Sequence, residues 1–259
     1  MIELIDFIKK IAFRRETKES EADISQRVFR IVSENSSETN SLKNLGEKWG
    51  FGSNEARISA WTRLLLKNES PRAPLNKDYF EQSSGNKNDF TVGVNQINLD
   101  VRRSFVIGDN FLFEDRKMRE FARKDLGIVL QTIFEENKDI SYTQGFHELV
   151  SIFFHVAGME ASYRISLVVI ERYYKDFLYS SFEETKSVLR FCVEIIKMED
   201  RMLFEHLHQN KINGFFSLSW LLTWFSYNKQ EIEGILRIFD FIISTNFIMP
   251  YYISAAVFV

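Results

Sequence analysis

The chain has 259 residues, of which 45 % are hydrophobic and 27 % are charged, so it is long enough to bury one large core or two small ones. Its net charge of −3 and the lack of a lysine- and arginine-rich tract exclude the basic field that a polyanion needs, so we expect no nucleic-acid partner. The 25 Phe, set against 3 Pro and 11 Gly, predict long elements with few interruptions. The single cysteine, Cys192, lies in an apolar helical pattern and indicates a buried thiol.

The first 40 residues differ from the rest of the sequence. Apolar spacing predicts amphipathic helices over 3–15 and 24–33, each followed by a polar run. We interpret 1–40 as an N-terminal helical extension, whose basic residues indicate a solvated helix face or, as the alternative, a membrane-contacting one. The N-terminus has no basic segment before its apolar part and no small-residue cleavage site. A signal peptide is therefore not expected, and the chain is predicted to be cytosolic.

From about residue 41 the sequence is continuous in character to its end. Apolar periodicity predicts one helix beginning near Gln144 and others over 56–67, 121–137, 161–178, 185–197, 199–209, 215–226 and 231–245. Residues 68–96, rich in Pro, Ser, Gly and Asn, predict a long connection. No run of alternating residues between turn signals requires a strand. We therefore expect an all-α fold, an irregular multi-helix array with no sheet and no repeat.

The last residues, 241–259, carry no charge and are nearly long enough to cross a bilayer. Polar residues and Pro250 interrupt this stretch, which favours two buried helical pieces that meet near Pro250. A membrane span over 241–259 is the alternative. The sequence stops on an apolar segment with no cap and no following charge, so we expect that the domain over 41–259 is truncated at its C-terminal end.

The common catalytic arrangements are missing from the sequence. The four histidines show no ligand spacing, and His147–Glu148 and His206–His208 are neighbours that point apart on a helix. A glycine-rich phosphate loop, a nucleophile elbow and a cysteine-nucleophile context are all missing. We expect no metal site and no self-sufficient enzyme.

One short segment places polar groups where packing does not require them. At helical or 3₁₀ spacing, Ile97, Asp100 and Arg103 fall on roughly one side. Ile97 can then anchor the segment while Asp100 holds the Arg103 guanidinium by a charge-assisted contact, and Arg102 faces away. In isolation, such an Asp and Arg pair is more often a surface ion pair of little energetic value.

A second segment lies between two strongly apolar helices. Tyr142 offers a rigid apolar face with a hydroxyl, Gln144 offers a donor and an acceptor, and Gly145 leaves room for a close approach. In isolation, this pattern equally indicates an ordinary helix start with an incidental glutamine.

Together, and in this order, the two segments resemble the signature of the TBC-domain Rab GTPase-activating proteins, whose motifs are IxxDxxR and YxQG. The resemblance runs from about residue 41 to the end. It includes an opening R-x-x-x-W-x-x-L-L helix and two later segments, one rich in Trp and one that carries Phe239 where the family usually has Trp. The residues that carry these further matches are Arg57, Trp61, Leu64, Leu65, residues 217–225, Arg237, Ile238, Phe239 and Asp240.

The resemblance implies a TBC-type fold and a partner, a Rab-family small GTPase. It implies that Arg103 is an arginine finger that compensates charge on the transferred phosphoryl group, and that Gln144 is a glutamine finger that orients the attacking water. Ile97, Asp100, Tyr142 and Gly145 are the supporting residues. The GTPase would bring the GTP and the magnesium, so no cofactor of the chain's own is expected.

Within the family, residues 99–104, 144–147 and 218–220 most resemble the subgroup anchored at the endoplasmic reticulum, whose members act on Rabs of the early secretory pathway. The resemblance implies a cytosolic domain at the endoplasmic reticulum or Golgi surface, with membrane contact through a C-terminal anchor of the full-length protein. The alternative from a different class is a helical module that binds a Rab, or serves as a scaffold, without activating it.

Overall fold

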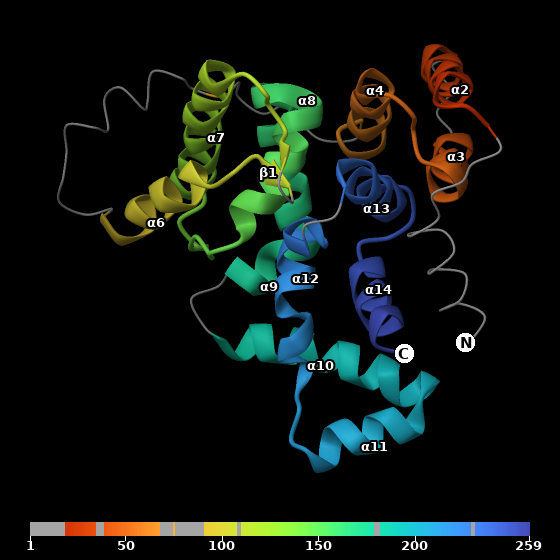
Figure 1. The fold of residues 1–259 in the computed structure, drawn as a ribbon, viewed down its shortest axis with the longest axis vertical. Helices are drawn as coiled ribbons and strands as arrows, with labels where there is room; N and C mark the ends of the chain where they lie inside the picture. Colours follow the sequence, from red (N-terminus) through yellow and green to blue (C-terminus); the bar gives the residue numbers. More distant parts are fainter. Residues whose placement is uncertain are drawn as a thin grey trace.

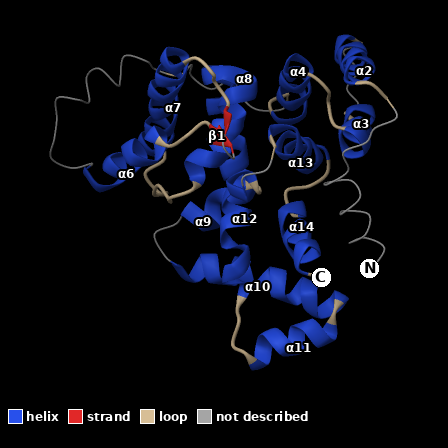
Figure 2. Ribbon diagram, in the orientation of Figure 1, coloured by secondary structure: helices blue, strands red, loops and turns tan. Residues whose placement is uncertain are grey.

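The computed structural model describes residues 19–34, 39–67, 75, 91–107, 110–178, 182–228 and 231–259, and in these ranges the chain is an array of helices (Figures 1 and 2). The predicted helix over 3–15 lies outside the described residues. In chain order the helices are α2 (Glu21–Ser33), α3 (Asn40–Trp49), α4 (Asn54–Leu65), α6 (Thr91–Arg102), α7 (Arg116–Glu136), α8 (Phe146–Val169), the π-helical turn η1 (Ile170–Tyr174), α9 (Lys175–Leu178), α10 (Phe182–Glu199), α11 (Arg201–Gln209), the 3₁₀ turn η2 (Gly214–Ser217), α12 (Leu218–Thr223), the 3₁₀ turn η3 (Ser226–Asn228), α13 (Ile232–Ser244) and α14 (Met249–Phe258).

The predicted all-α class is confirmed, with one addition to the expectation of no sheet. Strands β1 (Val106–Ile107) and β2 (Asn110–Phe111) pair antiparallel between α6 and α7. A pair this short presents no face to a core. It closes the turn that follows α6 and does not add a layer to the fold.

Helix α8 runs through the middle of the molecule, with α6 and α7 on one side and α2, α3, α4 and α13 on the other (Figure 1). Helices α7 and α4 both pack directly on α8. Helix α8 is buried on nearly all sides, as its continuous apolar sequence requires. Both polar segments that the sequence singled out lie beside it, at the end of α6 and in the loop that enters α8.

Residues Phe146–Leu178 form a helix that is long and apolar enough to cross a membrane, judged by length and composition alone. However, 61 % of its apolar 18-residue stretch is buried inside the protein. A central core helix accounts for both properties. The predicted break between helices near residue 160 appears as a kink at Gly158, whose φ of +73° is not helical.

The charge-free C-terminal stretch forms two helical pieces, as predicted. Helix α13 ends at Ser244, and α14 begins at Met249 with Pro250 in its first turn, where the missing N–H of proline costs nothing. Both helices bury most of their apolar residues. The alternative of one membrane span over 241–259 is wrong for the structure described, because no single helix covers these residues.

Three local predictions were wrong. The sequence pattern gave no separate helix over 40–49, yet α3 forms there and its Gly46 packs so closely on α13 that a Cβ would lie 1.9 Å from Ser244 Oγ. The connection 68–96 ends earlier than predicted, because α6 begins at Thr91.

The helix predicted over 215–226 is broken at Trp224 and Phe225, which take φ of +45° and +69° and are both almost fully buried. Burial of two large aromatic side chains offsets the cost of the left-handed backbone.

A buried carboxylate joins the N-terminal and C-terminal parts of the described structure. Asp240 of α13 accepts hydrogen bonds from the backbone N–H of Phe51 at 3.1 Å, from Arg57 Nε at 3.0 Å and from Trp61 Nε1 at 2.9 Å. Arg237, one turn earlier, donates to the Gly46 and Glu47 carbonyls at the end of α3. We call Arg57, Trp61, Arg237 and Asp240 the Asp240 cluster. It ties α3 and α4 to α13.

Candidate functional site

The end of α6 presents Arg103 to solvent on a buried base. Ile97 and Asp100 are buried, while the Arg103 side chain is 55 % exposed. Arg103 lies in the turn that follows α6, and its backbone N–H donates to the Asp100 carbonyl at 3.1 Å. Its guanidinium donates to Asp100 Oδ1. The structure therefore brings Ile97, Asp100 and Arg103 together as predicted, and Arg102 is exposed.

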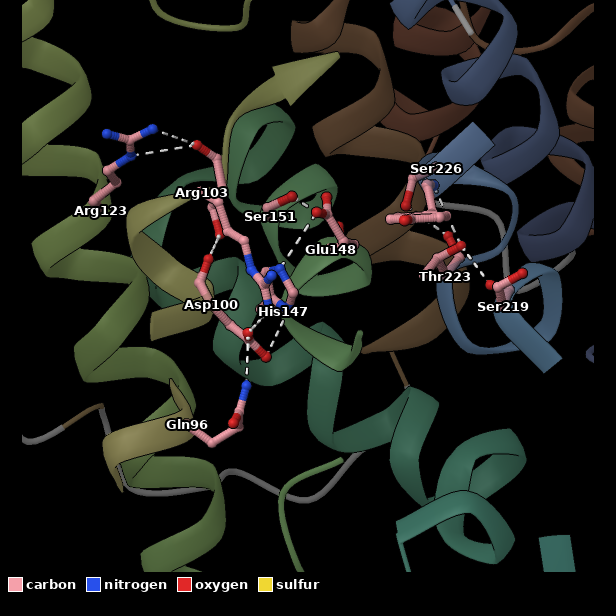
Figure 3. Close-up of polar contacts among 12 residues, drawn as sticks. Gln96, Asp100, Arg103, Arg123, His147, Glu148, Ser151, Ser219, Thr223 and Ser226 are labelled. Atoms are coloured by element: carbon pink, nitrogen blue, oxygen red, sulfur yellow. Dashed lines mark hydrogen bonds and ion pairs between the residues drawn. The ribbon is translucent and has the colours of Figure 1, made fainter. Parts of the chain in front are cut away.

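The Asp100 carboxylate accepts from three side chains, and Figure 3 draws the one from Gln96. Oδ1 accepts from Arg103 and from Gln96 Nε2, the latter at 2.9 Å, and Oδ2 accepts from the Tyr142 hydroxyl at 2.6 Å. His147 Nδ1 lies 3.4 Å from Oδ2. We call Gln96, Asp100, Arg103, Tyr142 and His147 the Asp100 cluster. It connects α6 to the loop that enters α8.

The electrostatics of the Asp100 cluster favour the charged forms of Asp100 and Arg103. Burial raises the pKa of Asp100, but hydrogen bonds from Tyr142 and Arg103 outweigh it, so the pKa is lowered overall. The hydrogen bond to Asp100 raises the pKa of Arg103, and the nearby charge of Glu148 adds to this. Burial and the bond to Asp100 raise the pKa of Tyr142 well above its usual value, so it stays a neutral donor.

The loop that carries Tyr142 and Gln144 is held by contacts with α9 and with α7. The Ser141 N–H donates to the Leu178 carbonyl at 2.8 Å, and Thr143 Oγ1 donates to the Phe177 carbonyl at 3.0 Å. The Tyr142 ring packs edge-on against Phe134 of α7 with centroids 5.5 Å apart. Gln144 follows directly and is exposed. Its side chain stands on a short, fixed stretch of backbone.

The backbone conformation at Gly145 favours glycine, although the chain itself leaves space for a Cβ there. It is the N-cap residue of α8 and has φ of +105°, a value that L side chains rarely adopt. A Cβ on Gly145 would lie 3.8 Å from Thr223 Cγ2 and 3.9 Å from Leu222 Cβ, which are ordinary contact distances. The backbone conformation is thus one reason for Gly145, and the expectation that it leaves room for the close approach of a partner or ligand stays a prediction.

His147 belongs to the site, although its place beside Glu148 in the sequence predicted only that the pair binds no metal. The ring is almost fully buried, with Nδ1 3.1 Å from the Tyr142 hydroxyl and Nε2 3.3 Å from Glu148 Oε1. Its position two residues after the YxQG segment was the available signal. Across the described part of the chain, His, Cys, Asp and Glu side chains form no group of three that could hold a metal ion.

The family model described as the Rab-GTPase-TBC domain matches residues 54–259, which is more than half of the chain. This chain belongs to the TBC domain family. The matched range includes every residue of the Asp100 cluster as well as Arg57, Trp61, Arg237 and Asp240.

Curated relatives agree with the family. The chain is 25 % identical to human TBC1 domain family member 20 over 96 % of its own length and 59 % of the relative's. It is 29 % identical to the GTPase-activating protein gyp10 of Schizosaccharomyces pombe over 85 % of its own length and 57 % of the relative's. The chain thus spans a little under three fifths of these two relatives.

Proposed function

We propose that this TBC domain stimulates GTP hydrolysis by a Rab-family small GTPase, with Arg103 and Gln144 as residues supplied in trans. The observation that carries the proposal is a half-exposed arginine held on a fully buried aspartate, in a chain that belongs to the TBC family. The name of the gyp10 relative as a GTPase-activating protein supports it.

Arg103 has the properties that an arginine finger needs. Its guanidinium keeps its charge, and one of its terminal nitrogens is engaged by Asp100. The other donors of the planar guanidinium remain for phosphoryl oxygens of a partner. An arginine brought into a GTPase site in this way stabilises charge that develops in the transition state.

Gln144 is proposed to orient the attacking water. It is exposed at the entry to α8, and its amide both donates and accepts hydrogen bonds. The link between Tyr142 and Asp100 joins its loop to the segment that carries Arg103. In this proposal the GTPase carries the nucleotide and the magnesium, and the domain needs no cofactor of its own.

The place of action is proposed from the resemblance to the endoplasmic-reticulum-anchored subgroup. We place the activity on the cytosolic face of the endoplasmic reticulum or Golgi, on Rabs of the early secretory pathway. Fractionation of cells that express the full-length protein tests this, since recovery in the soluble fraction alone would contradict it.

The test of the activity is single-turnover GTP hydrolysis by a panel of Rabs, with this chain and its variants. Arg103→Ala and Gln144→Ala should each reduce stimulation strongly, Arg103→Ala by about 10³-fold. Arg102→Ala is the matched control, because Arg102 is the exposed neighbour that does not contact Asp100 in the described contacts. It should retain stimulation within about 3-fold, since a surface charge contributes little.

The same experiment separates the alternative function. A module that binds a Rab without activating it would bind in a pull-down while the hydrolysis rate stays at its intrinsic value. Full stimulation by Arg103→Ala with an unchanged helical circular dichroism spectrum would refute the role given to Arg103.

A further inference from the structure

We propose that His147 is a positioning residue that holds the Arg103 and Gln144 segments in register, and that it acts as an imidazolium placed between Asp100 and Glu148. This inference rests on the proposed function. The geometry that carries it is the contact of one buried ring with two carboxylates and with the Tyr142 hydroxyl (Figure 3 shows His147 beside Asp100 and Glu148).

The hydrogen bonds of the Tyr142 hydroxyl determine whether His147 Nδ1 carries a proton. A tyrosine hydroxyl has one proton, and Tyr142 donates it to Asp100 Oδ2 at 2.6 Å. The Tyr142 hydroxyl oxygen also lies 3.1 Å from His147 Nδ1. With its proton donated to Asp100, this oxygen can only accept a further hydrogen bond. Nδ1 must therefore carry a proton that it donates to Tyr142, with Asp100 Oδ2 at 3.4 Å as a second acceptor.

The other ring nitrogen meets a second carboxylate. Nε2 is buried and lies 3.3 Å from Glu148 Oε1, within ion-pair distance although not aligned as a hydrogen bond. A neutral ring with its proton on Nδ1 would point a bare lone pair at this carboxylate. A second proton on Nε2 converts that repulsion into an ion pair.

The charged form also balances the site. Around the ring lie Asp100 and Arg103 from the end of α6, Tyr142 from the loop, and Glu148 from the first turn of α8 itself. With an imidazolium, two negative charges face two positive ones. The ring then links α6 to the start of α8, the two elements that position the proposed fingers, without touching the partner.

The protonation state is tested by long-range ¹H–¹⁵N NMR of the full chain labelled with ¹⁵N in histidine. The chain has four histidines, and the signal set that disappears in His147→Asn is that of His147. At neutral pH both nitrogens of His147 should show protonated shifts. A neutral-ring pattern with an unprotonated Nε2 would overturn the inference, and this measurement needs no Rab and no GTPase-activating activity.

The positioning role is tested by kinetics. His147→Phe keeps the ring's bulk and removes every polar contact, and the stimulated kcat should fall by about 30–100-fold with little change in KM, as for a displaced catalytic group. His147→Asn keeps a donor near the Nδ1 position but carries no charge, so it should recover only part of that loss. His206→Gln, an exposed histidine on α11, is the control and should match the parent chain.

The pH profile distinguishes positioning by charge from simple packing. Stimulation by the parent chain, with the intrinsic rate of the GTPase subtracted at each pH, should fall as rising pH removes the ring proton, whereas His147→Asn should give a flat profile in that range. Identical profiles for parent and His147→Asn, or full stimulation by His147→Phe, would refute the role.

Discussion

The Asp240 cluster and the Asp100 cluster use the same chemistry for different ends. Each centres on a fully buried aspartate that accepts from an arginine and from an aromatic side chain, Trp61 in one and Tyr142 in the other. They differ in the arginine. Arg57 is 13 % exposed and Arg103 is 55 % exposed.

This difference in exposure is the reason for the different roles that we propose for the two arginines. A guanidinium buried with its carboxylate cannot reach another molecule, so Arg57 ties α4 to α13 and serves the fold. A guanidinium held at one nitrogen and open at the others is pre-organised for an anion that arrives from outside. We therefore expect that replacing Asp240 mainly lowers the stability of the fold. Replacing Asp100 should lower both the stability and the proposed stimulation of GTP hydrolysis.

The largest expected effect is that of Asp240→Asn. It removes the charge that compensates Arg57 and Arg237, and burial already lowers the pKa of Arg237 to about 10. Leaving buried cations without their anion should cost about 3–5 kcal/mol of unfolding free energy. Urea denaturation followed by circular dichroism measures the change.

Asp139→Asn is the matched control for Asp240→Asn. Asp139 is exposed and pairs with Lys175 on the surface, so its loss should cost less than about 1 kcal/mol. Stimulation per folded molecule should survive Asp240→Asn at low temperature. Equal destabilisation by the two variants would contradict the comparison.

The next effect is that of Asp100→Asn, which weakens the bonds from Gln96, Arg103 and Tyr142. The expected decrease is about 2–3 kcal/mol of unfolding free energy, because hydrogen bonds to a charged group become weaker bonds to a neutral one while Arg103 itself remains solvated. The proposed stimulation should also fall by at least about 10-fold, since Arg103 loses its anchor. Unchanged activity would separate Asp100 from the site.

The stabilisation by Asp100 should depend on pH. The pKa of Asp100 is lowered in the folded chain by its hydrogen bonds, so its contribution is complete above the ordinary value of about 3.9 and is lost as pH falls through the lowered one. The stability difference between the parent chain and Asp100→Asn should therefore shrink below about pH 4. A stability difference between the two chains that grows in acid would contradict a lowered pKa of Asp100.

Local patterns predicted what depends on neighbours in the chain. The contact between Asp100 and Arg103, three residues apart, follows from helical spacing, and so do the long helices such as α7. The break at Trp224 did not follow, because it depends on the packing of the Trp224 ring against Phe153, Phe239 and Tyr173. Tertiary packing overrides helical propensity there.

Contacts between distant residues were outside the reach of spacing arguments. Arg57 and Asp240 are 183 positions apart, and both appeared only as parts of separate family segments. The link from Tyr142 to Asp100 spans 42 positions. The sequence indicated Tyr142 and Asp100 as members of two motifs, and the fold joins them through the packing of α6 and α7.

A smaller effect is expected for Gly145→Ala. The site has room for a methyl group, so the cost comes from φ of +105° and should be about 1–2 kcal/mol of unfolding free energy. Gly127→Ala is the matched control, because a Cβ at this helical position meets no atom within 4 Å and should stabilise by about 0.5–1 kcal/mol. Destabilisation by both, or by neither, would contradict the conformational reason.

The smallest expected effect is that of Tyr142→Phe, which tests whether the Asp100 cluster is one unit. The ring keeps its edge contact with Phe134, while Asp100 loses one donor and should lose about 1 kcal/mol of unfolding free energy. Tyr227→Phe, at an exposed tyrosine, is the control and should have no measurable effect. If Tyr142 joins the two segments, combining Tyr142→Phe with Asp100→Asn should cost less than the sum of the single changes, because the second change removes a contact that is already lost. Strict additivity would mean that Tyr142 and Asp100 act independently and that the two motifs are only neighbours.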